Sequence, residues 1–271
     1  GRIKKIVRCV DLKLTLLPFE SDFYSQHQVP VRFVGHPLAG RYPLQPDTAG
    51  ARQALGLPLD APILTLMPGS RASEVDMMAQ LFVQVATRIK EHMSTLQVLM
   101  PAANASRYRQ LTGLFASYNL ESVRLMEQQS KLAMEASDVV LLTSGTAALE
   151  AMLLKKPMVV SYRLGALTHK IVAPMIVTPF ISIPNLPAKR MLVPELIQAH
   201  ATVDGLSDAV MAAFDPAERC HLVSEFSAFH QLLKLPSGEL AAAAIEEAAE
   251  CRRGESAGGV AAYSTREPRA Q

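Results

Sequence analysis

The sequence predicts an α/β fold in which a parallel sheet is covered by helices on both faces. Short apolar runs alternate with segments whose apolar residues recur at helical spacing, which is the pattern of βαβ units. Two of these runs end in a glycine turn that leads directly into a helical segment. The composition, with 49% hydrophobic and 19% charged residues, is typical of a globular α/β protein.

The first 47 residues precede the regular alternation. We expect two strands at 12–17 and 31–34 with a helical segment at 21–27 between them. Residues 38–47 hold Gly40, Pro43 and Pro46 with little pattern and are interpreted as a linker. Asp47 or Thr48 then caps a short helix that ends at Leu55.

The regular alternation follows from residue 63. The expected strands are 63–67, 97–100, 123–126, 139–142 and 158–161. The expected helices between them are 74–92, 105–117, 130–136 and 146–154. After residue 190 the pattern becomes helical, at 193–200, 204–214, 216–233 and 239–251, and residues 252–271 have the composition of a disordered tail. In such sheets, ligand sites lie beyond the carboxyl ends of the strands.

The first glycine turn is Pro68-Gly69-Ser70-Arg71, directly after the run Ile63–Met67. A strand, a glycine turn and a helix start present free backbone N–H groups to an anion, and an arginine fork there can take two phosphate oxygens. The alternative is an ordinary tight turn with a surface arginine. The turn lacks the lysine of a Walker loop, and no G-x-G-x-x-G follows a strand, so dinucleotide-dependent redox chemistry has no support.

The second glycine turn contains Ser144, Gly145 and Thr146. Its small residues let a ligand approach the backbone, and the helix that follows directs its positive dipole end at the ligand. Glu150 lies four residues after Thr146 on the same helical face. A carboxylate at this position can accept hydrogen bonds from two ribose hydroxyl groups. The alternatives are a solvated glutamate or one paired with Lys155 or Lys156 just after its helix.

Asn185 is the third candidate site. It is a polar residue in an apolar, proline-fixed loop, and it either contacts a ligand or satisfies its own turn. The histidines show no metal-ligand spacing, and three distant cysteines argue for a reducing compartment and against a zinc site. A net charge of +2 gives no support for nucleic-acid binding, and no apolar stretch reaches the ~18 residues of a transmembrane helix.

Five motifs occur in an order and spacing that resemble bacterial lipid-A-disaccharide synthase, from about residue 2 to about 235. The motifs are Pro18-Phe19-Glu20, Phe33-Val34-Gly35-His36-Pro37, Met67-Pro68-Gly69-Ser70-Arg71, Ser144-Gly145-Thr146-Ala147-Ala148-Leu149-Glu150 and Ser182-Ile183-Pro184-Asn185-Leu186. The resemblance implies an inverting glycosyltransferase of the GT-B fold, with two Rossmann-like halves. It would transfer 2,3-diacylglucosamine from UDP to 2,3-diacylglucosamine 1-phosphate and so make the lipid A disaccharide 1-phosphate.

The resemblance also implies roles for single residues. The first turn, Gly69 to Arg71, belongs to the UDP-sugar site, and Arg71 contacts the diphosphate. Residues 144–146 line the phosphate and sugar edge, Glu150 holds the ribose, and Asn185 lies near the donor. No metal and no cofactor are implied. The family acts peripherally on the cytoplasmic face of the inner membrane, and the apolar faces of the late helices allow a homodimer.

The resemblance divides the chain and sets an expectation for its activity. The expected divisions are 1–37 as the end of the acceptor-side half, 38–47 as linker, 48–200 as the UDP-sugar-binding domain, 201–251 as closing helices and 252–271 as tail. The catalytic base is expected upstream of Gly1, so this chain is interpreted as a fragment that binds UDP weakly and is inactive alone. It departs from the family in Lys189-Arg190-Met191, where Gly-Arg-Glu is usual.

Two other interpretations are compatible with the same residues. One is another UDP-sugar enzyme of the GT-B fold, either a cell-wall UDP-GlcNAc transferase or an epimerase, which would also use a glycine turn and a ribose-binding glutamate. The other is a non-catalytic interaction module whose late helices pack on a partner or on a second copy.

Overall fold

The computed structural model describes residues 2–118, 123–143, 145–165 and 180–257. The chain divides into two compact units. The smaller unit is Gly1–Pro37 together with Leu233–Gln271, and the larger is Leu38–Leu232. The boundary near residue 233 therefore falls within the group of helices that the sequence predicted after residue 201.

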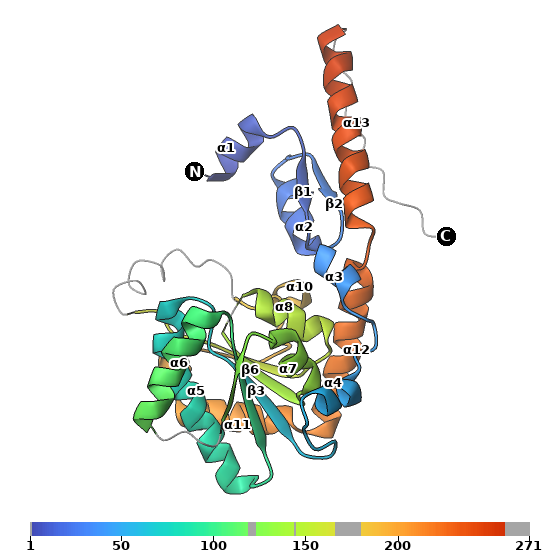
Figure 1. Ribbon diagram of the computed structural model, residues 1–271. Coiled ribbons are helices and arrows are strands. Elements are labelled where there is room, and N and C mark those ends of the chain that lie inside the picture. Colours follow the sequence, from blue (N-terminus) through green and yellow to red (C-terminus); the bar gives the residue numbers. More distant parts are fainter. Residues whose placement is uncertain (1, 119–122, 144, 166–179, 258–271) are drawn as a thin grey trace. The chain divides into compact units, whose positions relative to one another are not determined.

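The larger unit is built on a six-stranded sheet in which every pair of neighbouring strands is parallel (Figure 1). Its strands are β3 (Ile63–Met67), β4 (Gln97–Ala102), β5 (Arg124–Glu127), β6 (Val139–Leu142), β7 (Met158–Tyr162) and β8 (Glu195–Ile197). The described helices that lie in this unit, wholly or up to its boundary, are α3 (Pro37–Arg41), α4 (Thr48–Ala54), α5 (Ala72–His92), α6 (Ala105–Tyr118), α7 (Ser130–Ala136), α8 (Thr146–Leu153), α10 (Asn185–Ala188), the 3-10 helix η2 (Gln198–His200), α11 (Val203–Ala213) and α12 (Pro216–Leu233).

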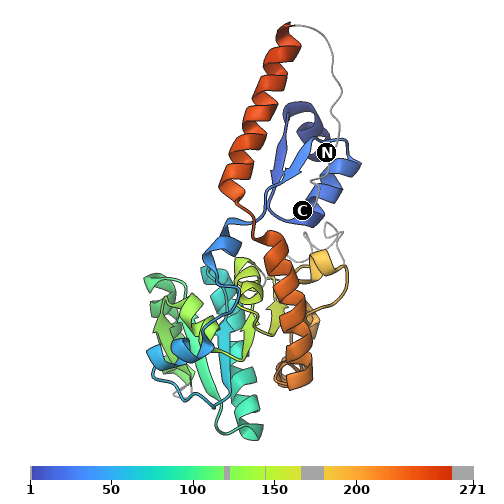
Figure 2. The same cartoon turned by 90° about the vertical axis from the view of Figure 1, so that its right-hand side faces the viewer.

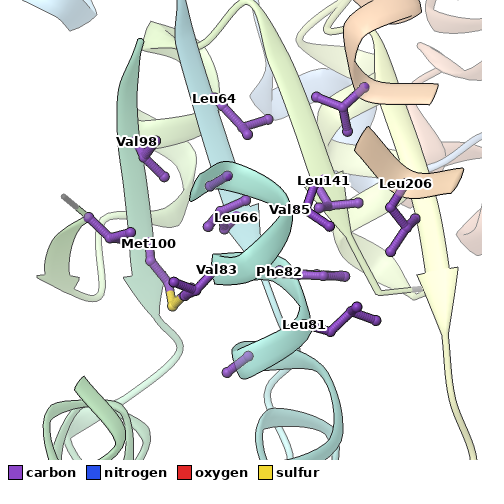
Figure 3. Packing of buried hydrophobic residues seen from close by; sticks show 14 of the residues in the cluster. Leu64, Leu66, Leu81, Phe82, Val83, Val85, Val98, Met100, Leu141 and Leu206 are labelled. Carbon is purple, nitrogen blue, oxygen red and sulfur yellow. The ribbon is translucent and has the colours of Figure 1, made fainter. Parts of the chain in front are cut away.

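Helices cover both faces of this sheet, as the sequence predicted. Side chains alternate along each strand, so Leu64 and Leu66 of β3 pack with α5, α6 and α11 in one hydrophobic cluster. Ile63 points to the opposite face and packs with residues of α4 and α7. Figure 3 shows Phe82 of α5 and Leu206 of α11 over the first face of the sheet, in one cluster with labelled side chains from β3, β4 and β6. The apolar run of β3 is therefore buried on both sides.

The strand order is β5-β4-β3-β6-β7-β8, so the direction of winding reverses between β3 and β6. These two strands pair with Met67 opposite Leu142, and the Thr143 N–H continues the pairing by donating to the Met67 carbonyl at 3.0 Å. The turns that follow β3 and β6 consequently begin side by side at the carboxyl edge of the sheet. A reversal of this kind is where doubly wound sheets bind their ligands.

All five strands predicted after residue 60 are confirmed, but the helix predicted at 193–200 is wrong. Its residues form β8, which pairs with β7 at the sheet edge, followed by η2. The Pro194 carbonyl accepts a hydrogen bond from the Val160 N–H at 2.9 Å, so the segment is held by β7 before β8 begins. Periodicity alone does not distinguish a helix from a strand in a short apolar run. This run is a strand because it pairs with β7 at the open edge of the sheet.

The smaller unit contains two parallel strands and three described helices. These are β1 (Lys13–Thr15), β2 (Val31–Phe33), α1 (Arg2–Cys9), α2 (Pro18–Gln26) and α13 (Ser237–Ala257). Ion pairs from α13 reach Arg32 through Glu247 at 2.8 Å and Asp11 through Arg252 at 3.0 Å. Figure 2 shows the same long helix, coloured red, beside the blue strand pair.

Two segments expected to be irregular are partly helical. The expected linker at 38–47 contains most of α3, and Asp47 at its end caps α4 by accepting a hydrogen bond from the Gly50 N–H at 2.8 Å. The expected tail from residue 252 begins inside α13, which continues to Ala257. Residues 258–271 of that tail lie outside the described residues.

Candidate functional site

The first glycine turn is closed by a carboxylate of the chain itself. Glu74, the third residue of α5, turns back so that its Oε2 accepts hydrogen bonds from the backbone N–H groups of Ser70 at 3.0 Å and Arg71 at 3.1 Å. Gly69 has φ +119°, and a Cβ at that position would lie 2.5 Å from the Glu74 Cβ. Only glycine fits there, because both the backbone angle and the close approach exclude a side chain.

Arg71 is bound to the same carboxylate and still faces solvent. Its Nη1 lies 2.7 Å from Glu74 Oε1, while the Arg71 side chain is 77% exposed and that of Glu74 only 9%. Burial favours the neutral form of Glu74, but hydrogen bonds from Arg71 and Ser70 outweigh it and lower the pKa of Glu74. This turn therefore offers an anion the free edge of a guanidinium and the exposed Ser70, since two backbone N–H groups are already used.

Tyr162, the last residue of β7, completes this group. Burial, followed by the negative charge of Glu74, raises the pKa of the Tyr162 hydroxyl. The hydroxyl group therefore stays protonated near the carboxylate. The sequence prediction missed both residues. The glutamate three positions after Arg71 was a detectable signal, because a glutamate at the third helical position is a common N-terminal cap.

The second glycine turn is open, in contrast to the first. Gly145 has φ +151° and precedes α8, and a Cβ placed on it would meet no described atom within 4 Å. Both Gly145 and Thr146 are exposed. The positive end of α8 therefore lies at an accessible surface where an anion can approach it. Ser144, the remaining candidate in this turn, lies outside the described residues.

Glu150 is half-buried one turn further along α8 and is bound by Tyr42. The Tyr42 side chain, which is 6% exposed, forms a hydrogen bond with Glu150, and Lys131 Nζ lies 4.9 Å from the centre of the Tyr42 ring. Burial raises the pKa of Glu150, although Tyr42 and the charge of Lys131 oppose that shift. Burial and the charge of Glu150 raise the pKa of Tyr42. Glu150 is thus neither a solvated residue nor held mainly by a lysine of its own helix.

The two lysines expected as alternative partners of Glu150 lie elsewhere. The Lys155 Nζ donates to the Leu153 carbonyl at 2.6 Å and contacts the buried His230. The Lys156 Nζ donates to the Thr48 hydroxyl at 2.7 Å. Tyr42, the partner that Glu150 does have, belongs to the segment expected to be a linker, so no local pattern connected the two residues.

Asn185 is fully buried and makes four hydrogen bonds within the protein. Its Oδ1 accepts from the N–H groups of Leu192 at 2.7 Å and Val193 at 2.8 Å. Its Nδ2 donates to the Val193 carbonyl at 2.8 Å and to Glu195 at 2.7 Å. These bonds support the alternative in which Asn185 satisfies its own loop. A direct contact between Asn185 and a ligand stays a prediction.

Glu195 of β8 fastens the same loop to the sheet. Its carboxylate accepts hydrogen bonds from the Ile181 N–H at 2.9 Å, the Ser182 N–H at 2.9 Å and the Ser182 hydroxyl at 2.6 Å, besides the one from Asn185. The sequence prediction missed this residue because it assigned the segment to a helix. The loop before β8 therefore has a fixed shape next to the strand that ends in Tyr162.

Two observations concern the surroundings of the site. Within the described ranges, no three His, Cys, Asp or Glu side chains converge closely enough to hold a metal ion. None of the described helices combines the length with the hydrophobicity that a membrane crossing requires.

Comparisons with known proteins give a family and a fold. A family model described as lipid-A-disaccharide synthetase matches residues 1–243. The lipid-A-disaccharide synthase of Alcanivorax borkumensis is 47% identical over 246 residues, which cover 90% of this chain and 64% of that protein. The Cellvibrio japonicus protein of the same name is 49% identical over 245 residues, with the same coverage. The chain thus spans about 64% of the length of these curated relatives.

Solved structures agree on the fold. A glycosyltransferase from Rickettsia africae superposes with a TM-score of 0.53 at 11% identity, over 92% of this chain and 67% of that one. WaaG, a glycosyltransferase involved in lipopolysaccharide biosynthesis, superposes with a TM-score of 0.51 at 14% identity, over 84% of this chain and 61% of that one. These neighbours confirm the predicted GT-B fold.

Proposed function

Because this chain belongs to the lipid-A-disaccharide synthetase family, we propose that its larger unit binds the UDP-sugar donor of a lipid-A-disaccharide synthase. The donor would be UDP-2,3-diacylglucosamine and the acceptor 2,3-diacylglucosamine 1-phosphate. One observation carries the proposal. The two glycine turns lie side by side where the strand order reverses, and they bring an exposed arginine and a half-buried glutamate to the same edge of the sheet.

The proposed reaction is an inverting glycosyl transfer. A hydroxyl group of the acceptor attacks the anomeric carbon of the donor in line, and the bond from that carbon to the diphosphate oxygen breaks. UDP leaves with the bonding electron pair, so negative charge grows on the diphosphate. Arg71 and the N-terminus of α8 would offset this charge, which lowers the barrier to departure. We assign no described residue of the site as the base that takes the hydroxyl proton.

Each candidate residue has a distinct part in the proposal. Arg71 contacts the diphosphate, and Gly145 and Thr146 line the phosphate and sugar edge together with Ser144. Glu150 accepts hydrogen bonds from the ribose hydroxyl groups. A carboxylate has about four acceptor sites, so the bond from Tyr42 leaves others for the ribose. Gly69 and Ser70 shape the first turn, and Asn185 holds the loop before β8.

The proposal extends to the membrane and to assembly. Donor and acceptor both carry acyl chains, so we propose peripheral contact with the cytoplasmic face of the inner membrane. Vesicle co-sedimentation with and without acylated substrate tests that contact. A homodimer is also proposed, and sedimentation velocity of the chain over a range of concentrations tests it.

Calorimetric titration with UDP tests the donor site. We compare the wild-type chain with Arg71→Ala and Glu150→Ala, each expected to lose about 1.5–3 kcal/mol, or roughly 10- to 100-fold in affinity. Arg88→Ala is the matched control, because Arg88 is a half-exposed arginine further along α5 that pairs with Asp204. Absence of UDP binding by the wild-type chain, or equal affinities for the wild type and Arg71→Ala, would refute the proposal.

A further inference from the structure

We infer that Glu74 is a positioning residue that sets the direction of the Arg71 guanidinium toward the donor diphosphate. The inference rests on the proposed function and adds to it one residue outside the predicted site. Glu74 does not need to touch the donor. Its effect passes through Arg71, whose guanidinium is the exposed member of the pair.

The contacts of Glu74 fix both ends of Arg71. Oε2 accepts from the Arg71 backbone N–H at 3.1 Å, and Oε1 pairs with the Arg71 Nη1 at 2.7 Å. A long side chain that is 77% exposed would otherwise sample many rotamers. Because Glu74 binds both the backbone N–H and the guanidinium of Arg71, only a narrow set of Arg71 rotamers remains. The guanidinium has five N–H donors, so several remain for phosphate oxygens while one holds Glu74.

Glu74 itself has little freedom to move. Its side chain is 9% exposed, and it accepts a hydrogen bond from the Ser70 N–H at 3.0 Å. It also lies so close to Gly69 that a Cβ there would be 2.6 Å from Oε2. A carboxylate fixed in this way serves as a rigid support. This geometry argues against the alternative in which Glu74 occupies a phosphate position and swings out when the donor binds.

A double-mutant cycle with two ligands tests the inference. Glu74→Gln keeps the size of the side chain and an oxygen for the backbone N–H groups but removes the charge that holds Arg71. We expect roughly a 3- to 10-fold loss of UDP affinity and less than about a twofold change for uridine, which lacks the diphosphate. In the Arg71→Ala background, Glu74→Gln should change UDP affinity by less than about twofold. Glu91→Gln, an exposed glutamate of α5, is the matched control.

Three outcomes of the cycle would overturn the inference. An equal loss for uridine and UDP means that Glu74 supports the fold and not Arg71 in particular. A gain in UDP affinity means that Glu74 competes with the phosphate. A full effect of Glu74→Gln in the Arg71→Ala background means that it acts by another route. If Glu74→Gln does not fold, Glu74→Asp provides the second variant, because it keeps the charge but draws it back from Arg71, with an expected loss of roughly fivefold for UDP alone.

A spectroscopic measurement separates this inference from the proposed function. The ¹⁵N–¹H signals of the Ser70 and Arg71 amides and of Arg71 Nε report the Glu74 contacts without any ligand. We expect all three to shift in Glu74→Gln and to stay in Glu91→Gln. If the wild type binds UDP no better than uridine but these signals shift, the proposed function fails while Glu74 still orients Arg71. If the signals do not shift, the positioning role is refuted whatever the UDP affinity.

Discussion

Lys156 is a buried cation at the end of the sheet opposite the glycine turns, and its replacement by methionine should stabilise the larger unit. The residue is 3% exposed and lies just before β7. Burial, followed by the neighbouring positive charge of Arg219, lowers its pKa to about 8, although Asp138 opposes the shift. Methionine has a similar length and no charge, so it removes the cost of burial and keeps most of the packing.

The magnitude follows from the difference between two pKa values. The folded-state pKa is about 8 and the ordinary value is 10.5, so at about 1.4 kcal/mol per pH unit the charged lysine costs about 3 kcal/mol near pH 7. Between these two values the unfolded chain binds more protons than the folded one, so the free energy of unfolding rises with pH. By pH 10 the cost has fallen to about 1 kcal/mol. Loss of the hydrogen bond to Thr48 subtracts about 1 kcal/mol from the gain at every pH.

Lys156→Met should therefore be about 2 kcal/mol more stable than the wild type at pH 7 and about equal to it at pH 10. Urea unfolding followed by far-ultraviolet circular dichroism at several pH values measures both numbers. Lys5→Met, a change at an exposed lysine of the smaller unit, is the control and should show no such pH dependence. A stability difference that stays constant from pH 7 to pH 10 would refute the reasoning, because it would show that Lys156 keeps its ordinary pKa in the folded chain.

Two further predictions concern Tyr42 and Lys189. Tyr42→Phe removes a hydrogen bond to Glu150, so calorimetry should show UDP bound roughly fivefold more weakly and 2′-deoxy-UDP less affected; equal losses for both ligands would contradict a role in ribose binding. Lys189 has φ +53°, a left-handed backbone angle that favours glycine, so Lys189→Gly should raise the free energy of unfolding by about 0.5–1 kcal/mol in urea titrations. A less stable glycine variant would mean that the lysine side chain makes a compensating contact.

Local patterns allowed most of the sheet to be predicted. Apart from β5, which holds Arg124 and Glu127, the strands from Ile63 to Tyr162 are mainly apolar runs separated by helical segments, so the alternation could be predicted without tertiary information. Gly69 and Gly145 could be found for the same reason, because a glycine between a strand and a helix is a feature of three or four adjacent residues. β8 could not be predicted in this way, because its three residues form a strand only by pairing with β7.

The contacts that complete the site were harder to predict because they join distant residues. Tyr42 meets Glu150 from a segment rich in proline and glycine, and nothing near either residue indicates the other. Glu195 and Asn185 are closer in sequence, but their bond depends on the fold of the loop before β8. Glu74 is the exception, since its spacing from the turn is that of an N-terminal cap and its identity is visible in the sequence.

The two glycine turns resemble each other in sequence but differ in what they offer a diphosphate. At the first turn the N–H groups of Ser70 and Arg71 already bind the Glu74 carboxylate, so a phosphate could reach them only by breaking two hydrogen bonds and an ion pair of a buried group. At the second turn Gly145 is exposed and the positive end of α8 is accessible. We therefore expect the diphosphate to take backbone hydrogen bonds from α8 and a side-chain contact from Arg71. In the proposed reaction, the diphosphate would lie between the Arg71 guanidinium and the N-terminus of α8, so the negative charge that develops on the leaving group would meet donors already in position.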